Sequence, residues 1–281
     1  MYATIPRNPG RLHGLWALTY RELKKWFNEP MLLFLSIFQP LLWMGLFGKV
    51  IDFNAILVNY LGVPGDFANA LIRLFGTTDY FSFMVVGMIT FLAYLTTLYS
   101  GISLVLDRRT GFLGKVLSTP VARETVVLSK VLSSTIRAVV EALVVLVIAL
   151  FLGFRLAPTF GVVGLLGFVA VISLLCAGLS SLFLLTAIRS KEWEPQVLVA
   201  NLFSLPLLFA SNALFPQSML PGWLQVVVRI NPITYATDAL RQLILYPLNP
   251  TQFAVDLAYL VTFTLLIFVG CTLLSRRYLT Q

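Results

Sequence analysis

The sequence predicts an all-α integral membrane protein, and three observations lead to that prediction. Of the 281 residues, 58% are hydrophobic and only 11% are charged, and the mean hydropathy is +0.88. A soluble domain carries roughly a quarter charged residues, because a small core needs a charged surface to stay in solution. The apolar residues also gather into runs of about 20, the length that crosses the hydrocarbon core of a bilayer. Composition therefore excludes a soluble enzyme and a disordered chain.

Six apolar runs are the predicted spans of a single membrane domain over residues 1–281. Four of them contain no charged residue, whereas the third contains Arg137 and Glu141 and the sixth has Asp256 near its start. The runs lie at about 31–48, 81–106, 131–152, 159–187, 197–215 and 253–274. Since the number of runs is even, we expect both termini on the same side of the membrane.

The distribution of basic residues predicts which side that is, because Lys and Arg collect in cytoplasmic loops. Of the 20 Lys and Arg, 14 lie in segments that would share one side of the membrane. These segments precede the first run, connect the second to the third and the fourth to the fifth, and follow the sixth. The opposite side holds Lys49, Arg73, Arg155, Arg229 and Arg241. We therefore expect cytoplasmic termini in a multi-pass protein of the plasma or inner membrane. The net charge of +8 then indicates contact with anionic lipid, and no nucleic-acid partner is expected.

Helical spacing before the first run predicts an amphipathic helix over residues 16–28, lying in the cytoplasmic membrane interface. Its apolar face holds Trp16, Thr19, Tyr20, Leu23, Trp26 and Phe27, and the opposite face holds Arg21, Lys24, Lys25 and Asn28. Glu22 belongs to the same helix. An ordinary membrane anchor explains this pattern equally well.

Two segments are expected on the external side. Residues 49–80 form a loop, and residues 221–246 form a helical hairpin that is re-entrant or interfacial. Pro221 starts its first short helix, which runs through Arg229, and Asn231 with Pro232 supplies an N-cap and first turn for the second. The other candidate residues of this hairpin are Trp223, Tyr235, Asp238 and Arg241.

A helix is predicted over about 108–120, in the cytoplasmic connection between the second and third runs. Charged and apolar residues alternate there at helical spacing, and Pro120 ends the pattern. Phe112 and Val116, with Leu113 and Leu117, are expected to insert into a partner, while the basic residues meet an acidic or lipid surface. Composition alone favours an ordinary basic loop.

The sequence lacks the motifs of a catalytic or metal-binding chain. Neither a phosphate-binding G-x-x-x-x-G-K-[ST] loop nor an H-E-x-x-H motif occurs. His13 is the single histidine, and Cys176 and Cys271 are too far apart to form a ligand pair. We therefore expect a chain that is not catalytic, binds no metal and has no cofactor of its own.

The chain resembles the permease subunit of ABC transporters of the ABC-2 type, a family that includes drug and polysaccharide exporters. One matching stretch runs from Asp79 to Lys130. Its motifs are Val86-Gly87-Met88, Ser100-Gly101-Ile102-Ser103, Asp107-Arg108-Arg109-Thr110-Gly111 and Leu117-Ser118-Thr119-Pro120-Val121. The other matches are Gln39-Pro40, Ser204–Ser211, Phe215-Pro216, Leu220–Leu224 and Arg229–Arg241. The resemblance covers nearly the whole chain and is weakest over 49–80.

The resemblance implies a dimer of permease subunits, with a second copy or a similar chain, carrying two separate ATPase subunits that bind ATP and Mg. It also implies that the helix between spans 2 and 3 is a coupling helix inserted into a cleft of the ATPase. Its residues would be Arg108, Arg109, Gly111, Phe112, Val116, Leu117, Thr119 and Pro120. The interfacial helix, with Trp16, Arg21, Glu22, Lys25 and Trp26, would pack beside it.

The resemblance further implies export of a lipophilic drug, a lipid or a glycan from the cytoplasm or inner leaflet. A membrane enzyme acting on a lipid or isoprenoid is an alternative, but it needs a carboxylate or histidine cluster that the sequence does not show. A secondary transporter is a third hypothesis, but it would show inverted repeats and ion-coupling residues in broken helices.

Arg137 and Glu141 are four residues apart in the third run, so they share a helix face. An unpaired charge in mid-bilayer costs about 2.5–3.5 kcal/mol on insertion scales, which favours pairing. One interpretation is a structural ion pair inside the bundle, with Arg137 extending towards the cytoplasm. The other is a polar patch on the translocation route or at the dimer seam.

Overall fold

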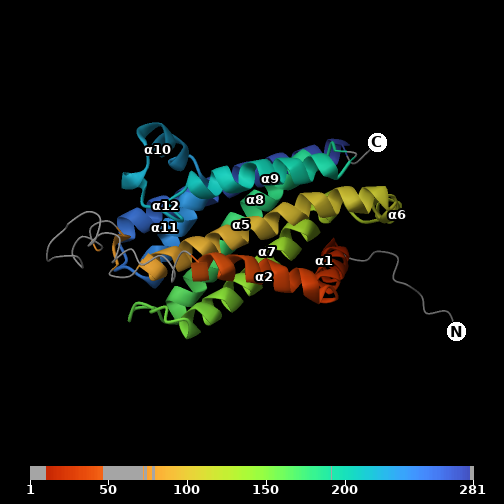
Figure 1. The fold of residues 1–281 in the computed structure, drawn as a ribbon. Helices are drawn as coiled ribbons and strands as arrows, with labels where there is room; N and C mark the ends of the chain where they lie inside the picture. The colour runs from red at the N-terminus through yellow and green to blue at the C-terminus, as the bar shows by residue number, and fades with distance from the viewer. Residues whose placement is uncertain (1–10, 47–71, 73–74, 78–79, 191, 279–281) are drawn as a thin grey trace.

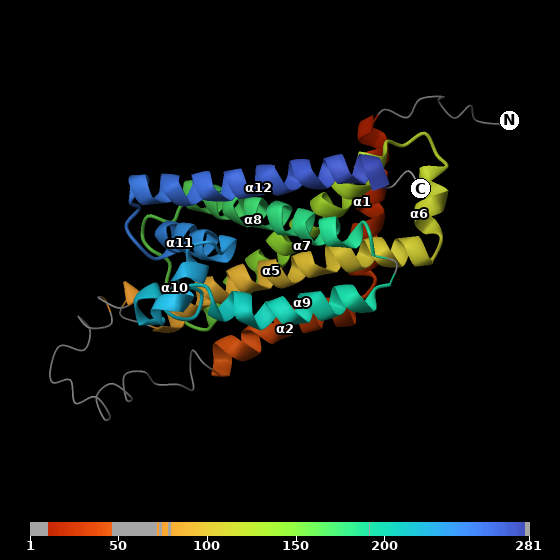
Figure 2. The same ribbon diagram turned by 90° about the horizontal axis from the view of Figure 1, so that it is seen from above.

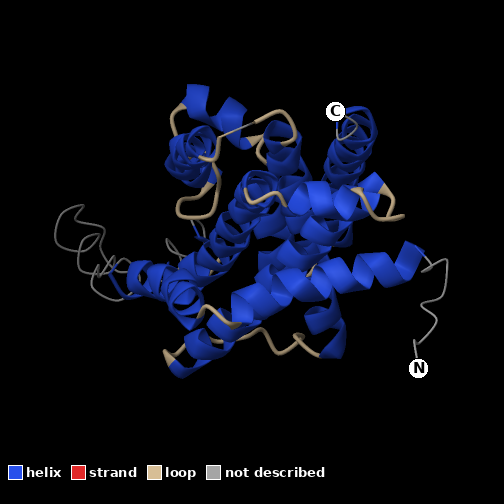
Figure 3. Ribbon diagram, turned by 90° about the vertical axis from the view of Figure 1, so that its right-hand side faces the viewer, coloured by secondary structure: helices blue, strands red, loops and turns tan. Residues whose placement is uncertain are grey.

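The computed structural model of the chain describes residues 11–46, 72, 75–77, 80–190 and 192–278. Over these residues the regular elements are all helices, and none of them is a strand (Figure 3). The predicted all-α fold class is therefore confirmed. The predicted external loop over 49–80 lies mostly outside the described residues.

Four long apolar helices form the body of the molecule (Figure 1). They are α5 (Tyr80–Arg109), α7 (Arg123–Phe151), α8 (Val162–Ala187) and α12 (Pro250–Tyr278). At 1.5 Å per residue they are about 39–45 Å long, which is enough to cross a bilayer. They coincide with the second, third, fourth and sixth predicted runs, and each has the length and hydropathy of a membrane span.

The first and fifth predicted runs form shorter helices. These are α2 (Pro30–Gly45) and α9 (Glu194–Phe209), each of 16 residues. Such a helix is about 24 Å long, less than the ~30 Å hydrocarbon core of a bilayer. Both pack against α5. By length and composition, the described residues thus contain four helices able to span a membrane.

The remaining helices lie at the two ends of the bundle. At one end, α1 (Arg11–Phe27) crosses the long helices, and α6 (Phe112–Leu117) lies beyond the end of α5 (Figure 2). The opposite end carries α10 (Gly222–Val228) and α11 (Pro232–Ile244). We name these ends after α6 and α11. At the α6 end, Arg276 of α12 forms an ion pair of 2.5 Å with Glu124 of α7.

The predicted helix over 108–120 is broken in two. Helix α5 continues to Arg109, and Gly111 then adopts a φ of 71° before α6 begins at Phe112. A Cβ at residue 111 would meet no atom within 4 Å, so the left-handed backbone, rather than a lack of space, favours glycine there. The turn separates α6 from the axis of α5, and α6 ends three residues before Pro120.

The two predicted hairpin helices are present, with bounds within two residues of the prediction. Asn231 is the N-cap of α11, and its side chain accepts a hydrogen bond from the backbone N–H of Ile233 at 3.0 Å. The same side chain donates to the carbonyls of Leu207 and Ala210, at 2.9 and 2.8 Å. One residue therefore begins α11 and fastens it to the end of α9.

Helix α5 has no room for a side chain at Gly87. A Cβ there would lie 2.0 Å from the carbonyl oxygen of Ala213. We expect Gly87→Ala to lower the free energy of unfolding by about 1–3 kcal/mol or more, since the backbone at Ala213 would have to move. This exceeds the ~1 kcal/mol that alanine contributes through helix propensity. Thermal unfolding in detergent measures the change.

Gly45→Ala in α2 is the matched control, because a Cβ there would meet no atom within 4 Å. It should leave the unfolding midpoint unchanged or slightly higher. Equal losses in the two variants would contradict the argument from close contact.

Candidate functional site at the α6 end

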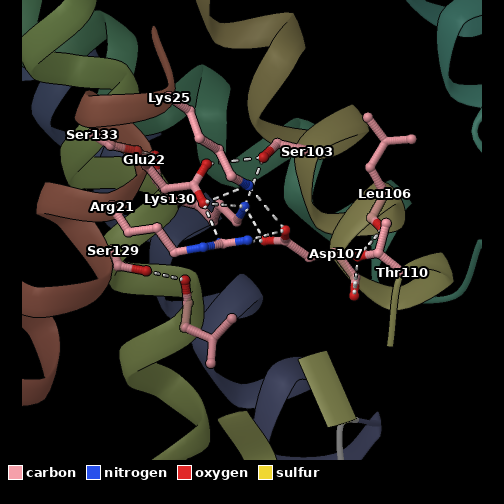
Figure 4. A network of polar contacts seen from close by, with 11 residues as sticks. Arg21, Glu22, Lys25, Ser103, Leu106, Asp107, Thr110, Ser129, Lys130 and Ser133 are labelled. Carbon is pink, nitrogen blue, oxygen red and sulfur yellow. Dashed lines mark hydrogen bonds and ion pairs between the residues drawn. The ribbon is translucent and has the colours of Figure 1, made fainter. Parts of the chain in front are cut away.

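Five charged side chains from three helices meet where α1, α5 and α7 cross. We call Arg21, Glu22, Lys25, Asp107 and Lys130 the ion cluster (Figure 4). Asp107 accepts hydrogen bonds from Arg21 at 3.0 Å and from Lys130 at 2.5 Å, and Lys25 lies 3.2 Å away. Glu22 lies 2.7 Å from Arg21 and 3.1 Å from Lys130. Each carboxylate thus bridges a cation on α1 to the cation on α7.

The centre of the ion cluster is buried. The side chains of Lys130, Asp107 and Glu22 are 3%, 7% and 8% exposed. Ser103 adds a hydroxyl that donates to Glu22 at 3.0 Å and accepts from Lys130 at 2.6 Å. Burial raises the pKa of Glu22, but the charges of Lys130 and Lys25 and the hydrogen bond from Lys130 outweigh it, so the pKa lies below its usual value. Glu22 is therefore ionised at neutral pH, and the cluster is held by charge-assisted hydrogen bonds.

The predicted orientation of the interfacial helix needs a correction. Arg21 and Lys25 were expected on a polar face opposite Trp26, yet they bind Asp107, and Trp26 is buried on the same side of α1 as Glu22. The aromatic residues that remain outside are Trp16, Tyr20 and Phe27. Helical periodicity within α1 could not show this, because the partner charges lie more than 80 residues away.

Helix α6 turns its apolar side chains towards its own chain. Leu113 and Val116 are 4% and 9% exposed and belong to a cluster with residues of α5, α7 and α8. Phe112 lies beneath Arg21, whose guanidinium carbon is 3.3 Å from the ring centroid. Leu113 and Val116 thus face their own bundle, because an amphipathic helix of six residues buries its apolar face on the nearest helices. The expected insertion of this helix into a partner stays a prediction. Leu117 is half-buried beside Leu113 and Val116.

The exposed surface of α6 and its flanks is small and polar. Its residues are Gly111, Gly114, Lys115, Ser118, Thr119 and Pro120. Arg108, expected to face a partner, instead donates to the carbonyls of Ile188 and Ser190, at 2.7 and 2.6 Å. It thereby fastens the end of α8 to α5. Arg109 is half-exposed and lies 3.4 Å from Glu192.

A cavity of about 870 Å³ lies between α1, α2, α5, α7 and α9, and we call it the interhelix cavity. Its volume is in the range of small-molecule sites. The wall is mainly apolar and aromatic, with Trp43, Phe91, Leu95, Leu205, Phe209 and Phe215 among its residues. Glu22, Lys25 and Ser103 also line it, so the cavity adjoins the ion cluster.

Arg137 and Glu141 both line the interhelix cavity from α7. Glu141 is 2% exposed and accepts hydrogen bonds from Ser36 at 3.0 Å and Thr96 at 2.5 Å. Arg137 forms no ion pair with Glu141 and no hydrogen bond within the described part of the chain, and its Nε is buried. The structural ion pair is therefore not formed, because two hydroxyl groups from α2 and α5 hold Glu141 instead.

The predicted hairpin residues divide into buried and exposed ones. Arg241 is 2% exposed and donates to the carbonyls of Asn212 and Ala213, at 2.8 and 2.9 Å. Asp238 accepts a hydrogen bond from the Asn212 amide. Asn231 and Pro232 are also buried, whereas Pro221 and Trp223 lie at the surface and Tyr235 is half-buried. Among the residues that the structure describes, no group of three His, Cys, Asp or Glu side chains could hold a metal ion.

Comparison with known proteins identifies the family. The family model described as ABC-2 type transporter matches residues 13–245, which include the ion cluster, α6 and both hairpin helices. A transport permease named ycf38 from Pyropia yezoensis is 32% identical over 231 residues, 81% of this chain and 72% of its own length.

Two drug-resistance proteins are also similar. The daunorubicin resistance ABC transporter permease protein DrrB1 of Streptomyces coeruleorubidus is 28% identical over 200 residues, 68% of this chain and 69% of that protein. A doxorubicin resistance ABC transporter permease protein, DrrC of Mycobacterium tuberculosis, is 26% identical over 224 residues, covering 79% and 74% of the two chains. The resemblance seen in the sequence motifs is thus confirmed, and the chain belongs to the ABC-2 type transporter family.

Proposed function

We propose that this chain is the permease subunit of an ATP-driven exporter. It works as a dimer, in the simplest case with a second copy of itself, and each copy binds one separate ATPase subunit that holds ATP and Mg. The names of the similar DrrB1 and DrrC proteins support export of a lipophilic compound. The mainly apolar and aromatic wall of the interhelix cavity supports a lipophilic drug, a lipid or a glycan as substrate.

The proposed topology has six spans, with α2 and α9 as the first and fifth. The α6 end faces the cytoplasm in this topology, because Arg21, Lys25, Lys130 and Arg276 lie there. The α11 end then faces outwards, and α10 and α11 form the external hairpin from which substrate leaves. In this orientation α1 lies in the cytoplasmic interface of the plasma or inner membrane.

One observation carries this proposal. Helix α6 lies beyond the long helices, yet its Phe112 is held under Arg21 and its Leu113 and Val116 are buried against α5, α7 and α8. A force on its polar surface would therefore reach the long helices without first deforming a flexible loop. Closure of the two ATPase subunits would then move the spans as a rigid body.

The exposed surface of α6 gives the test. We expect the double variant Lys115→Glu with Ser118→Trp to reduce copurification of the ATPase and its substrate-stimulated hydrolysis about tenfold, as for a loss of ~1.4 kcal/mol. The isolated ATPase should remain active. Both residues are exposed, so the unfolding midpoint of the permease should not change.

Arg155→Glu is the control, because Arg155 is exposed just beyond the other end of α7. It should leave copurification and hydrolysis unchanged. Normal ATPase coupling in the α6 double variant would overturn the assigned interface. A purified chain that transports substrate with no ATPase present would overturn the proposed function itself.

A further inference from the structure

Arg137 lines the interhelix cavity without a direct hydrogen-bonding partner among the described residues. The carboxylate of Glu141 accepts two hydroxyl hydrogen bonds, from Ser36 and Thr96. The guanidinium of Arg137 has neither an ion pair nor a hydrogen bond with any described residue, although its Nε is buried. A buried donor without an acceptor is costly, and a buried cation more so. The guanidinium of Arg137 therefore lacks an acceptor among the described residues, although the cavity wall also carries the carboxylates of Glu22, Glu29 and Glu141.

Three exposed polar side chains of the cavity wall offer further donors, while Glu29 adds an exposed carboxylate. Gln39, Tyr99 and Asn201 line it from α2, α5 and α9, and their side chains form no hydrogen bond with described residues. An amide supplies two N–H donors and a phenol one O–H donor. Together with Arg137 they form a set suited to an acceptor-rich anion. Arginine is the side chain best matched to phosphate and carboxylate, which it binds in a bidentate manner.

The remainder of the wall indicates what the anion is attached to. Aromatic and aliphatic side chains dominate it, and a free inorganic anion would gain nothing from them. Burial of a hydrocarbon or ring system against this wall is favourable, because it removes apolar surface from water. Arg137 lies seven residues beyond Lys130 on α7, or about 10 Å at 1.5 Å per residue. A polar end held by Arg137 would thus sit about two helical turns from the ion cluster.

We propose that the interhelix cavity binds an amphiphile whose polar end is an anion, a phosphate or a carboxylate held by Arg137, with its apolar part against the aromatic wall. This names the substrate class of the proposed exporter and rests on that proposal. A cationic amphiphile is disfavoured at this position, because Arg137 would repel it.

Tryptophan fluorescence can report occupancy of the cavity. Of the five Trp, Trp26 and Trp43 line the cavity, while Trp16, Trp193 and Trp223 do not and are at least 37% exposed. Replacing the last three with Phe leaves only the two tryptophans of the cavity. The full-length chain in this background, in phosphatidylcholine nanodiscs, is titrated with 12-bromododecyl phosphate, whose bromine quenches tryptophan. The matched cation is 12-bromododecyl trimethylammonium.

We expect the phosphate amphiphile to quench saturably and to bind about tenfold more tightly than the ammonium one. Arg137→Gln should weaken its binding about tenfold, and Arg137→Lys should restore part of the loss, because a lysine keeps the charge without the bidentate geometry. Arg123→Gln is the control, since Arg123 is an exposed residue at the start of α7 that does not line the cavity. It should bind like the parent.

A variant with the opposite expected sign separates binding from misfolding. Glu141→Gln removes the negative charge nearest the proposed anion, so it should tighten binding of the phosphate amphiphile about threefold. Damage to the fold could not produce tighter binding. Inorganic phosphate should not compete at concentrations where unbrominated dodecyl phosphate does.

Three results would overturn the inference. They are tighter binding of the ammonium amphiphile, an Arg137→Gln variant that binds the phosphate as the parent does, and equal competition by inorganic phosphate, which would show a site for free anions. Binding is measured without an ATPase. Its failure therefore leaves proposed ATP-driven export intact, and failure of ATPase coupling leaves the binding result intact.

Discussion

Asp107→Asn is expected to destabilise the protein by about 3–5 kcal/mol, the cost of removing one partner from a buried ion pair. Asp107 is the acceptor shared by Arg21, Lys25 and Lys130, and its side chain is 7% exposed. Asparagine has nearly the same shape but no charge, so three cations would face Glu22 alone. Thermal unfolding in detergent should show a lower midpoint, and α1 should become more accessible to protease.

Export should fall together with stability, because the ion cluster joins α1 to the helices that flank α6. The double variant of Asp107→Asn with Lys130→Met should lose less than the sum of the single variants, since the second change removes a cation left without its partner. Arg109→Gln is the control on the same helix, because the Arg109–Glu192 pair is exposed and such pairs contribute about 0–1 kcal/mol. Additive losses in the double variant would mean that Asp107 and Lys130 act independently.

Arg241→Met should have a comparable effect at the opposite end of the bundle. Burial lowers the pKa of Arg241 to about 10, so the guanidinium stays protonated at neutral pH. It binds the carbonyls of Asn212, Ala213 and Phe83, and its carbon lies 3.4 Å from the centroid of the Phe83 ring. Methionine keeps much of the volume but removes every donor, so we expect a loss of about 3–5 kcal/mol.

Arg241→Lys should recover only part of this stability, because one ammonium group cannot reproduce the planar fork of donors. Arg229→Met is the control, since Arg229 is exposed at the end of α10. The unfolding midpoints in detergent are expected to fall in the order parent, Arg229→Met, Arg241→Lys and Arg241→Met. A lysine variant as stable as the parent would show that charge alone, rather than the three carbonyl contacts, holds α11 in place.

The long helices could be predicted from the sequence because a run of apolar residues is itself the condition for a membrane helix. The predicted span 81–106 lies within α5 (Tyr80–Arg109). The start of α7 was placed eight residues too late, at 131 instead of Arg123. Hydropathy does not detect the polar first turns of a helix, and these turns contain Lys130 of the ion cluster.

The C-terminal end of α9 could not be predicted from hydropathy, because it depends on contacts with residues distant in the sequence. Hydropathy continues to residue 215, but α9 stops at Phe209. The carbonyls just beyond it are bound by Asn231 and Arg241, which are more than 20 residues away. Similarly, the sequence predicted Arg21, Glu22 and Lys25 as residues of an interfacial helix. It could not show that these three residues contact Asp107 and Lys130. Such pairings depend on which helices become neighbours.

The interhelix cavity was missed for the same reason. Its walls come from five helices, and each contributes residues that look like ordinary membrane-facing side chains when read alone. Only Arg137 and Glu141 gave a signal, as charges inside an apolar run. The structure changes the meaning of that signal from a mutual pair to a Glu141 held by Ser36 and Thr96, beside an Arg137 that has no hydrogen bond or ion pair with a described residue.

The wide sequence separation within the ion cluster also has a consequence for biosynthesis. Arg21 and Asp107 are 86 residues apart, and Lys130 follows later still. At about 5–20 residues per second, α1 leaves the ribosome roughly 5–20 s before its last partner is made. During that interval the charged side chains of α1 can be solvated only by water and lipid headgroups. Both are present at the membrane interface and absent from the bilayer interior. Helix α1 is thus made well before its partners and can reach its final position only after they are made.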